Sequence, residues 1–233
     1  MSAKRISLSS LPARSRSLKD SDGTVLLHYS LEPYTLPDLP RRSGRRISHY
    51  HQAVESQWRT HWETSGLSAA RTAYNGAYSS GTPFHAHVMS LKSEITYFSP
   101  PYLSICQDAR EDCGDGRPVI VRSSVTWDIR AGYPLPLSHF FPNQHTWKKT
   151  VIDAICTEGR RRVSSGEYLM DEPVEEALIQ AFSPDRFFLT PSGLYIFYPL
   201  CSVSAYAEGL PSFLVPTPCF PLFDPCIQAE NEL

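Results

Sequence analysis

One segment in the C-terminal third of the chain restricts the fold more than any other. Residues 187–190 and 194–198 are aromatic and β-branched runs, which favour β-strands. Between them, Pro191 presets one φ angle and Gly193 tolerates a positive φ angle, so the segment predicts a tight turn. We therefore expect a β-hairpin over residues 187–198 in the centre of the core. The side chains expected to be buried are Leu189, Leu194, and Ile196 or Phe197.

Length and composition are those of an ordinary globular protein. The chain has 233 residues, of which 41% are hydrophobic, and this size fits one domain with extensions or two small lobes. No apolar run approaches the ~18 residues of a membrane span, and residues 1–19 lack the apolar core of a secretion signal. We therefore expect a cytoplasmic protein, or an exported one if a leader has been removed. The expected parts are a disordered basic leader (1–22), an α+β domain (23–216, with 23–118 and 119–216 as its lobes if it is divided) and a Pro-rich tail (217–233).

Positive charge is concentrated near the N-terminus. Residues 1–46 contain nine Lys and Arg residues against four acids, whereas Arg186 is the only basic residue in 171–233. A basic segment can bind nucleic acid or an anionic membrane, or it can be a disordered leader followed by a solvated helix start. We favour the leader, and expect no nucleic-acid ligand, because no aromatic side chain lies among its basic residues to stack on bases.

The six cysteines do not form a metal-binding pattern. None belongs to a Cys-x-x-Cys pair, and Cys106/Cys113 and Cys219/Cys226 are each seven residues apart. We expect reduced thiols, because nothing at the N-terminus indicates export to an oxidising compartment.

Hydrophobic periodicity predicts both helices and strands. Apolar residues recur at intervals of three and four after Ser43, the expected helix cap, and stop before Gly66, the expected helix end. We expect an α+β fold, with an antiparallel sheet that has helices packed on one face and is partly open on the other. The expected helices are 44–64, 143–163 and 172–182, and the expected strands besides the hairpin are 25–31, 88–97, 102–106 and 119–129.

Two further stretches follow a family pattern. Residues 126–141 contain a Thr-x-Asp step, a Gly turn and a Leu-x-Leu step before two Phe residues, and residues 206–213 are Tyr-Ala-Glu-Gly-Leu-Pro-Ser-Phe. With the hairpin, they resemble the C-terminal domain of the RsiV-type anti-sigma factors. That domain has no assigned reaction and also accompanies catalytic domains in some peptidoglycan deacetylases. The resemblance covers about residues 24–216 and is strongest over 119–216.

Patterns typical of enzymes and metal sites are absent from the sequence. His85 and His87 would share one side of a strand, but their spacing identifies no third ligand. The acidic residues between Asp108 and Asp115 lack the spacing of a calcium loop. No nucleophile elbow or glycine-rich phosphate loop is present. We therefore expect no catalytic residue, no metal and no cofactor.

Aromatic residues in polar segments are the candidates for binding contacts. Residues 74–87 and 107–117, expected as loops, combine Tyr, Phe and His with Gly, Ser, Asn and Asp. This mixture makes adaptable contacts and is enriched at protein interfaces. The candidate binding residues are Tyr74, Tyr78, Phe84, His85, His87, Asp115 and Arg117.

The resemblance implies a non-catalytic binding module, because anti-sigma factors of that family bind lysozyme through this domain in cell-wall stress signalling. The expected ligand is a lysozyme-like protein or a cell-wall glycan. Two alternatives remain open. One is a cell-wall glycan hydrolase or a deacetylase-associated protein, and the other is a cytoplasmic regulatory partner that uses the basic N-terminal segment.

Overall fold

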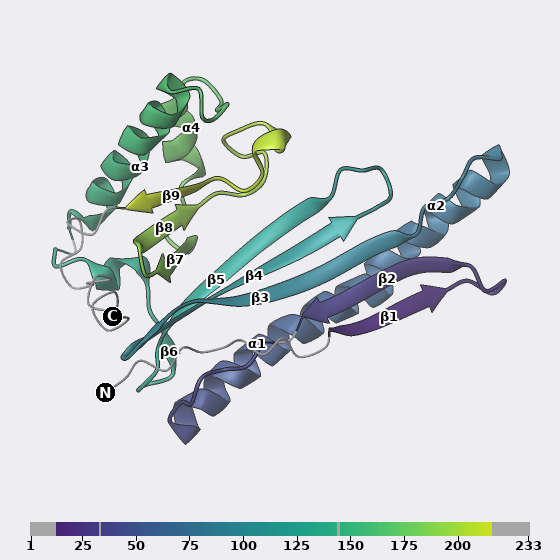
Figure 1. Ribbon diagram of the computed structural model, residues 1–233, viewed down its shortest axis with the longest axis horizontal. Coiled ribbons are helices and arrows are strands. Elements are labelled where there is room, and N and C mark those ends of the chain that lie inside the picture. Colours follow the sequence, from purple (N-terminus) through teal and green to yellow (C-terminus); the bar gives the residue numbers. More distant parts are fainter. Residues whose placement is uncertain (1–12, 33, 144, 216–233) are drawn as a thin grey trace, which may run out of the picture. The chain divides into compact units, whose positions relative to one another are not determined.

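The computed structural model describes residues 13–32, 34–143 and 145–215 (Figure 1). These residues form two compact units, the first comprising 13–94 and 107–121 and the second 95–106 and 122–215. The strands form a six-stranded sheet, in the order β1 to β6, and a three-stranded sheet in the order β7–β8–β9. The expected α+β class is confirmed.

The bounds of the elements are as follows. The strands are β1 (Arg14–Lys19), β2 (Val25–Glu32), β3 (His87–Ser99), β4 (Tyr102–Asp112), β5 (Val119–Asp128), β6 (Tyr133–Pro134), β7 (Phe187–Thr190), β8 (Gly193–Phe197) and β9 (Ser212–Val215). The helices are α1 (Arg41–His61), the π-helical η1 (Trp62–Gly66), α2 (Leu67–Ser80), α3 (Trp147–Ser164) and α4 (Val174–Ala181), with short 3₁₀ segments at Leu137–Phe140 and Tyr206–Glu208.

The first unit contains a parallel pair of strands. β1 and β2 are antiparallel, whereas β2 and β3 are parallel, with Leu27 opposite His87. Parallel neighbours need a crossover of a dozen or more residues, and the helical run over 41–80 supplies it. The expectation of an antiparallel sheet is therefore wrong for the β2–β3 pair, which this helical run connects.

The expected disordered leader contains an ordered strand. Residues 14–19 form β1, in which Leu18 lies opposite Leu27 and packs against an apolar cluster of the first unit. The neighbouring strand β2 supplies partners for the backbone groups of β1, so this mostly polar segment can form a strand. Residues 1–12 of the expected leader and the expected tail at 217–233 lie outside the described residues.

The first helix begins earlier and continues further than its sequence predicts. It starts at Arg41, so Ser43 lies inside the helix, where its Oγ donates to the Pro40 carbonyl at 3.1 Å. Gly66, the expected end, is helical with φ −61°. A Cβ at Gly66 would lie 3.2 Å from Leu27 Cδ1, so this glycine allows the helix to approach the sheet closely. The run ends at Gly81, whose φ is +68°.

The two expected loops are shorter than predicted. Residues 74–80 belong to α2, which contains four alanines and therefore favours helix. Residues 108–112 belong to β4. The connections that remain are residues 81–86, between α2 and β3, and 113–118, between β4 and β5.

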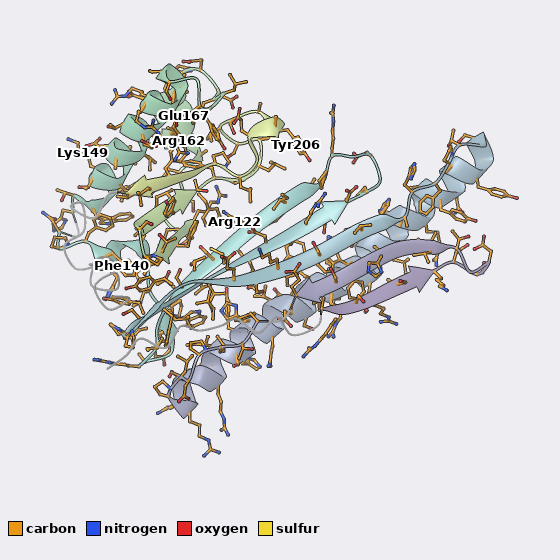
Figure 2. The ribbon with its side chains drawn as sticks, in the orientation of Figure 1. Arg122, Phe140, Lys149, Arg162, Glu167 and Tyr206 are labelled. Carbon is orange, nitrogen blue, oxygen red and sulfur yellow. The ribbon has the colours of Figure 1, made fainter. Side chains whose placement is uncertain are left out.

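The second unit is built around the predicted hairpin. β7 and β8 pair antiparallel with Phe187 opposite Ile196, and Leu189, Leu194, Ile196 and Phe197 are all buried, as expected. The helices expected at 143–163 and 172–182 are present as α3 and α4. Arg162 projects from α3 and its guanidinium lies 4.9 Å from the centre of the Phe213 ring, which anchors α3 to β9 (Figure 2). The predicted hairpin is thus confirmed as part of the core.

Gly193 has a φ of +137°, as the predicted turn requires. We expect Gly193→Val to lower the free energy of unfolding by at least about 1 kcal/mol, because a β-branched residue resists positive φ. Chemical denaturation measures this change. The control is Ser192→Val, an exposed turn position with no positive φ. Equal losses in the two variants would contradict a special backbone requirement at Gly193.

Among the described residues, every helix is too short or too polar to span a lipid bilayer.

Candidate functional site

The predicted binding residues lie at one end of the first unit. Tyr74 and Tyr78 are on α2, whose C-terminal end carries the 81–86 connection. Phe84 and His85 belong to that connection, and His87 is the first residue of β3. Asp115 and Arg117 lie in the turn between β4 and β5.

Specific contacts hold three connections together at this end. The Tyr74 hydroxyl donates to Asp22 Oδ2 at 2.6 Å, which joins α2 to the β1–β2 turn. The Tyr74 and Phe84 rings contact edge to face, with centroids 5.2 Å apart. A Cβ at Gly114 would lie 2.9 Å from His85 Cβ, so the β4–β5 turn packs directly on the 81–86 connection. The structure therefore brings together segments that are far apart in sequence.

Only some of the predicted residues are available for contact. Tyr78 is 81% exposed, and His85, Asp115 and Arg117 are also exposed. We call these four residues the tip surface. Tyr74 and Phe84 are half-buried and pack against the apolar cluster of the first unit, so they connect the tip surface to the core.

His87 is a core residue and not a surface contact. Its side chain is 3% exposed because β3 turns alternate residues from His87 onward, including Met89 and Leu91, into the core. The sequence pattern places His85 and His87 on one face of a strand. This is wrong, because His85 precedes β3 and only His87 belongs to it. Among the residues that the structure describes, no three His, Cys, Asp or Glu side chains are grouped closely enough to hold a metal ion.

The surroundings of His87 favour its neutral form. Its Nδ1 has no hydrogen-bond partner within the described part of the chain, and its ring stacks on Phe84 at 6.4 Å between centroids. Burial lowers the pKa of the imidazole, while the carboxylates of Asp112 and Asp115 act in the opposite direction. His87 therefore supports the tip surface as an uncharged aromatic side chain.

A second buried histidine lies between α1 and the sheet. His51 Nδ1 donates to Gln107 Oε1 at 3.1 Å, and Gln107 Nε2 donates to Ser93 Oγ at 3.0 Å. All three side chains are buried. Burial lowers the pKa of His51 to about 4, although the bond to Gln107 acts in the opposite direction.

This shift predicts that acid destabilises the protein. His51 has a pKa of about 4 when folded against an ordinary value of 6.5, so the unfolded chain binds more protons between these pH values. Its contribution to the free energy of unfolding is therefore complete above pH 6.5 and is lost as the pH falls towards 4. The total loss is up to about 3 kcal/mol. Denaturation at a series of pH values should show a shallower pH dependence for His51→Gln.

The exposed His49, two residues away on α1, provides the control. His49→Gln should keep the full pH dependence of the parent protein. Because His87 is shifted in the same direction, some acid sensitivity should also persist in His51→Gln. Identical pH profiles for the parent and His51→Gln would contradict the prediction.

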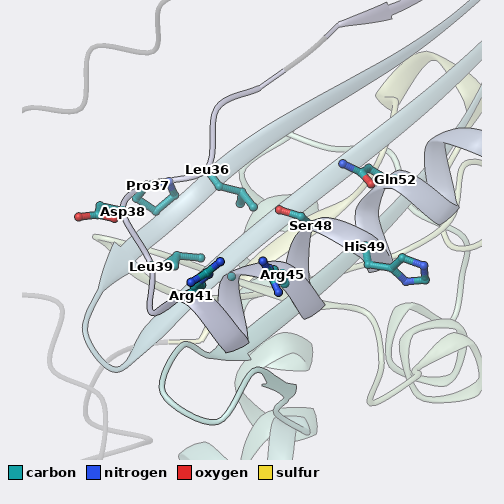
Figure 3. Close-up of a pocket in the computed structure, with 10 residues that line it drawn as sticks. Leu36, Pro37, Asp38, Leu39, Arg41, Arg45, Ser48, His49 and Gln52 are labelled. Atoms are coloured by element: carbon teal, nitrogen blue, oxygen red, sulfur yellow. The ribbon is translucent and has the colours of Figure 1, made fainter.

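Two hollows lie along α1. The first, of about 550 Å³, is lined by residues 36–39 before the helix and by Arg41, Arg45, His49 and Gln52 among others (Figure 3). The second, of about 400 Å³, is lined from α1 by Gln52, Glu55, Ser56 and Arg59 and from β1 by Arg14 and Arg16. Gln52 lines both, so we treat the two hollows as one surface and call it the α1 groove.

The charges of the α1 groove are partly paired. Arg16 Nη1 donates to Glu63 Oε1 at 2.6 Å, and the Tyr29 hydroxyl donates to the same oxygen at 2.6 Å. Both bonds lower the pKa of the Glu63 carboxyl group, and the bond from Tyr29 has the larger effect. Glu55 is half-buried, and burial raises the pKa of its carboxyl group although Arg14 and Arg59 lie near enough to oppose the shift.

Sequence reasoning did not identify the α1 groove. Its helical residues at positions 41, 45, 48, 52, 55 and 59 recur at intervals of three and four, which is the signal of one helix face. That face is polar, whereas the prediction of the helix rests on the apolar residues of a different face. The β1 arginines were assigned to a leader, so their place beside α1 could not be anticipated.

Four of the six cysteines lie in the described residues. Within the described ranges, Cys106, Cys113, Cys156 and Cys201 form no disulfide with one another. Burial raises the pKa of the Cys113 and Cys156 thiols, and nearby carboxylates raise it further, which disfavours the nucleophilic thiolate. Cys219 and Cys226 lie outside the described residues.

Comparisons with known proteins identify a family for part of the chain. Residues 146–217 match the model of a protein family of unknown function, DUF3298. This segment lies almost entirely in the second unit, so neither the tip surface nor the α1 groove belongs to it. A comparison with curated proteins found no match.

Two crystal structures of DUF3298 family proteins have a similar fold. One, from Bacteroides fragilis, is 11% identical with a TM-score of 0.65, and the similarity covers 94% of this chain and 93% of that one. The other, from Pseudomonas aeruginosa, is 15% identical with a TM-score of 0.55, covering 90% and 93%. Residues 146–217 therefore match the DUF3298 family, and the chain shares the fold of two solved proteins of that family.

Proposed function

We propose that the protein is a non-catalytic binding module of the RsiV-like type that recognises a protein ligand through the tip surface. The observation that carries this proposal is Tyr78, a large aromatic side chain that is 81% exposed on the last turn of α2. Tyrosine is enriched among the residues that dominate binding energy, because it offers a large contact area with few rotatable bonds.

The surroundings of Tyr78 support a role in recognition. His85 lies on the connection that follows α2, and this connection packs against the β4–β5 turn that carries Asp115 and Arg117, so exposed charged and polar groups are present at the same end of the unit. The Tyr74 bond to Asp22 and the packing of Gly114 on His85 hold these connections before any ligand binds. A surface fixed in advance loses less entropy on binding, which favours affinity.

The sequence resemblance supplies the ligand class. RsiV-type anti-sigma factors bind lysozyme through the corresponding domain, so a lysozyme-like protein is the first ligand to test. A role in signalling would follow from the same resemblance. A cell-wall glycan is the second ligand, and it is tested with the same variants.

Replacing Tyr78 by alanine should weaken ligand binding by about 1–2 kcal/mol, the cost of losing an aromatic contact. Titration calorimetry with lysozyme and, separately, with soluble peptidoglycan fragments measures the dissociation constant. The melting temperature should be nearly unchanged, because the ring makes little contact with the rest of the protein.

Tyr133→Ala is the control, since Tyr133 is also exposed but lies on β6 of the second unit. It should leave the dissociation constant unchanged. Binding that is insensitive to Tyr78→Ala would place the ligand elsewhere. Absence of binding to both lysozyme and glycan would refute the proposed ligand classes.

A further inference from the structure

The α1 groove is separate from the tip surface. Both hollows are lined by the same face of α1, and Gln52 borders each of them. The groove lies beside the start of β1, whereas the tip surface lies beside the turn at the end of β1, so they occupy opposite ends of the β1–β2 hairpin. The hollows of about 550 and 400 Å³ together reach the upper end of the range for small-ligand sites, which suits a ligand that extends along the helix.

Arginine side chains dominate the charge of the groove. It is lined by Arg14, Arg16, Arg41, Arg45 and Arg59, whereas Asp38 and Glu55 are its carboxylates. Within the described ranges, Arg16 has an ion-pair partner, but Arg14, Arg41 and Arg45 make no hydrogen bond or ion pair through their side chains. The groove therefore has a surplus of unneutralised positive charge.

Two features make this positive charge unfavourable in the free protein. Arg41 and Arg45 are four residues apart on α1, a spacing at which like charges repel each other. Arg41 also lies in the first turn, where the helix dipole disfavours cations, and this turn contains no acidic residue. An anionic ligand would relieve both effects.

The groove also offers groups that bind hydroxyls. Glu55 is half-buried and has no hydrogen-bond partner among the residues described, and Gln52 and Ser56 lie within the same turn of α1. A carboxylate in this position accepts hydrogen bonds from ligand hydroxyls and repels anionic groups, so it favours a ligand that carries many hydroxyls beside its anionic groups. Of the rings that line the groove, that of Tyr29 is buried and the imidazole of His49 is exposed, so the groove offers no row of aromatic side chains on which successive bases could stack.

We propose that the α1 groove binds an acidic polysaccharide. The carboxylates or sulfates of the glycan bind the arginine guanidinium groups, whose planar donors match such oxygens in pairs. The sugar hydroxyls donate to Glu55 and exchange hydrogen bonds with Gln52 and Ser56. This binding is independent of the ligand proposed for the tip surface, because the two surfaces share no residue.

Fluorescence anisotropy measures how tightly the full-length protein binds each of four polymers. Hyaluronate carries carboxylates, heparin also carries sulfates, dextran is neutral, and oligo-dT represents a nucleic-acid backbone. We expect hyaluronate or heparin to bind at low salt and to weaken as salt rises, with little binding of dextran. The difference between hyaluronate and heparin identifies the anionic group.

Matched variants locate the binding surface. Arg45→Gln with Arg59→Gln should weaken acidic-glycan binding at least about tenfold, since two charge-assisted contacts are lost. The control, Arg42→Gln with Arg110→Gln, removes the same charge from exposed residues of the first unit that do not line the groove. It should change the affinity less than about threefold, since screened charges outside a binding site contribute little.

Four results would overturn the proposal. They are failure of both acidic glycans to bind, equal binding of dextran, tighter binding of oligo-dT, and an equal loss of affinity in the control variant. Tyr78→Ala should leave acidic-glycan binding unchanged. The proposal for the α1 groove can therefore fail while that for the tip surface holds, and the reverse. Circular dichroism of each variant checks that the fold is retained.

Discussion

Replacing Trp62 by alanine should lower the free energy of unfolding by about 3–5 kcal/mol, as truncation of large buried aromatic residues does. The Trp62 side chain is fully buried, and its ring lies 5.8 Å between centroids from Tyr29 and 5.8 Å from Trp58. Its Nε1 donates to Glu111 Oε1 at 2.8 Å. The truncation therefore leaves a cavity between helix and sheet and also removes the donor to a half-buried carboxylate. Urea denaturation followed by circular dichroism measures the loss.

The neighbouring Trp58 provides the comparison. It lies one turn earlier on the same helix and is only half-buried, so Trp58→Ala should cost clearly less. A cost below about 1 kcal/mol for Trp62→Ala would mean that the helix is not anchored to the sheet at this residue.

Phe197→Ala should also lower the free energy of unfolding by about 3–5 kcal/mol. Phe197 is 3% exposed and forms an apolar cluster with Cys106 and Phe188, whose ring is 6.2 Å away between centroids. Thermal and chemical denaturation should agree on the sign of the change.

The size-conserving variant Phe197→Leu separates packing from a general effect of substitution. It retains most of the apolar volume, so its cost should stay below about 1.5 kcal/mol. If Phe197→Ala and Phe197→Leu are equally destabilising, loss of buried volume is not the cause, and the role assigned to Phe197 in the core is wrong.

Local sequence signals predicted the elements whose contacts are local. The hairpin at 187–198 combines two strongly β-forming runs with Pro191 and Gly193, and all of these features act within a dozen residues. The helices α3 and α4 were predicted from the spacing of their apolar residues along the chain. Such elements need no knowledge of distant residues.

Features that depend on distant partners could not be predicted. Gly66 and Gly81 look alike in the sequence, but Gly66 is packed against Leu27 and stays helical, whereas Gly81 ends the helix. β1 is polar, and it is a strand because β2 lies beside it. The parallel pairing of β2 with β3 likewise appears only when the helical crossover is placed.

The same distinction applies to the candidate site. The residue types of the tip surface could be selected from the sequence, and the structure brings their segments together. His87 was misassigned because the direction of its side chain depends on where β3 begins. The α1 groove required β1 and α1 to be adjacent, which no local pattern indicated.

The uninterrupted helical run from Arg41 to Ser80 sets a distance between the two proposed surfaces. At 1.5 Å per residue, Tyr78 of the tip surface lies about 55 Å from Arg41 and about 30 Å from Arg59 along the helix axis. No compact ligand can contact Arg41 and Tyr78 at the same time. Substitutions at one end should therefore add to those at the other without coupling, and a polymer that engages both would gain affinity from its length alone.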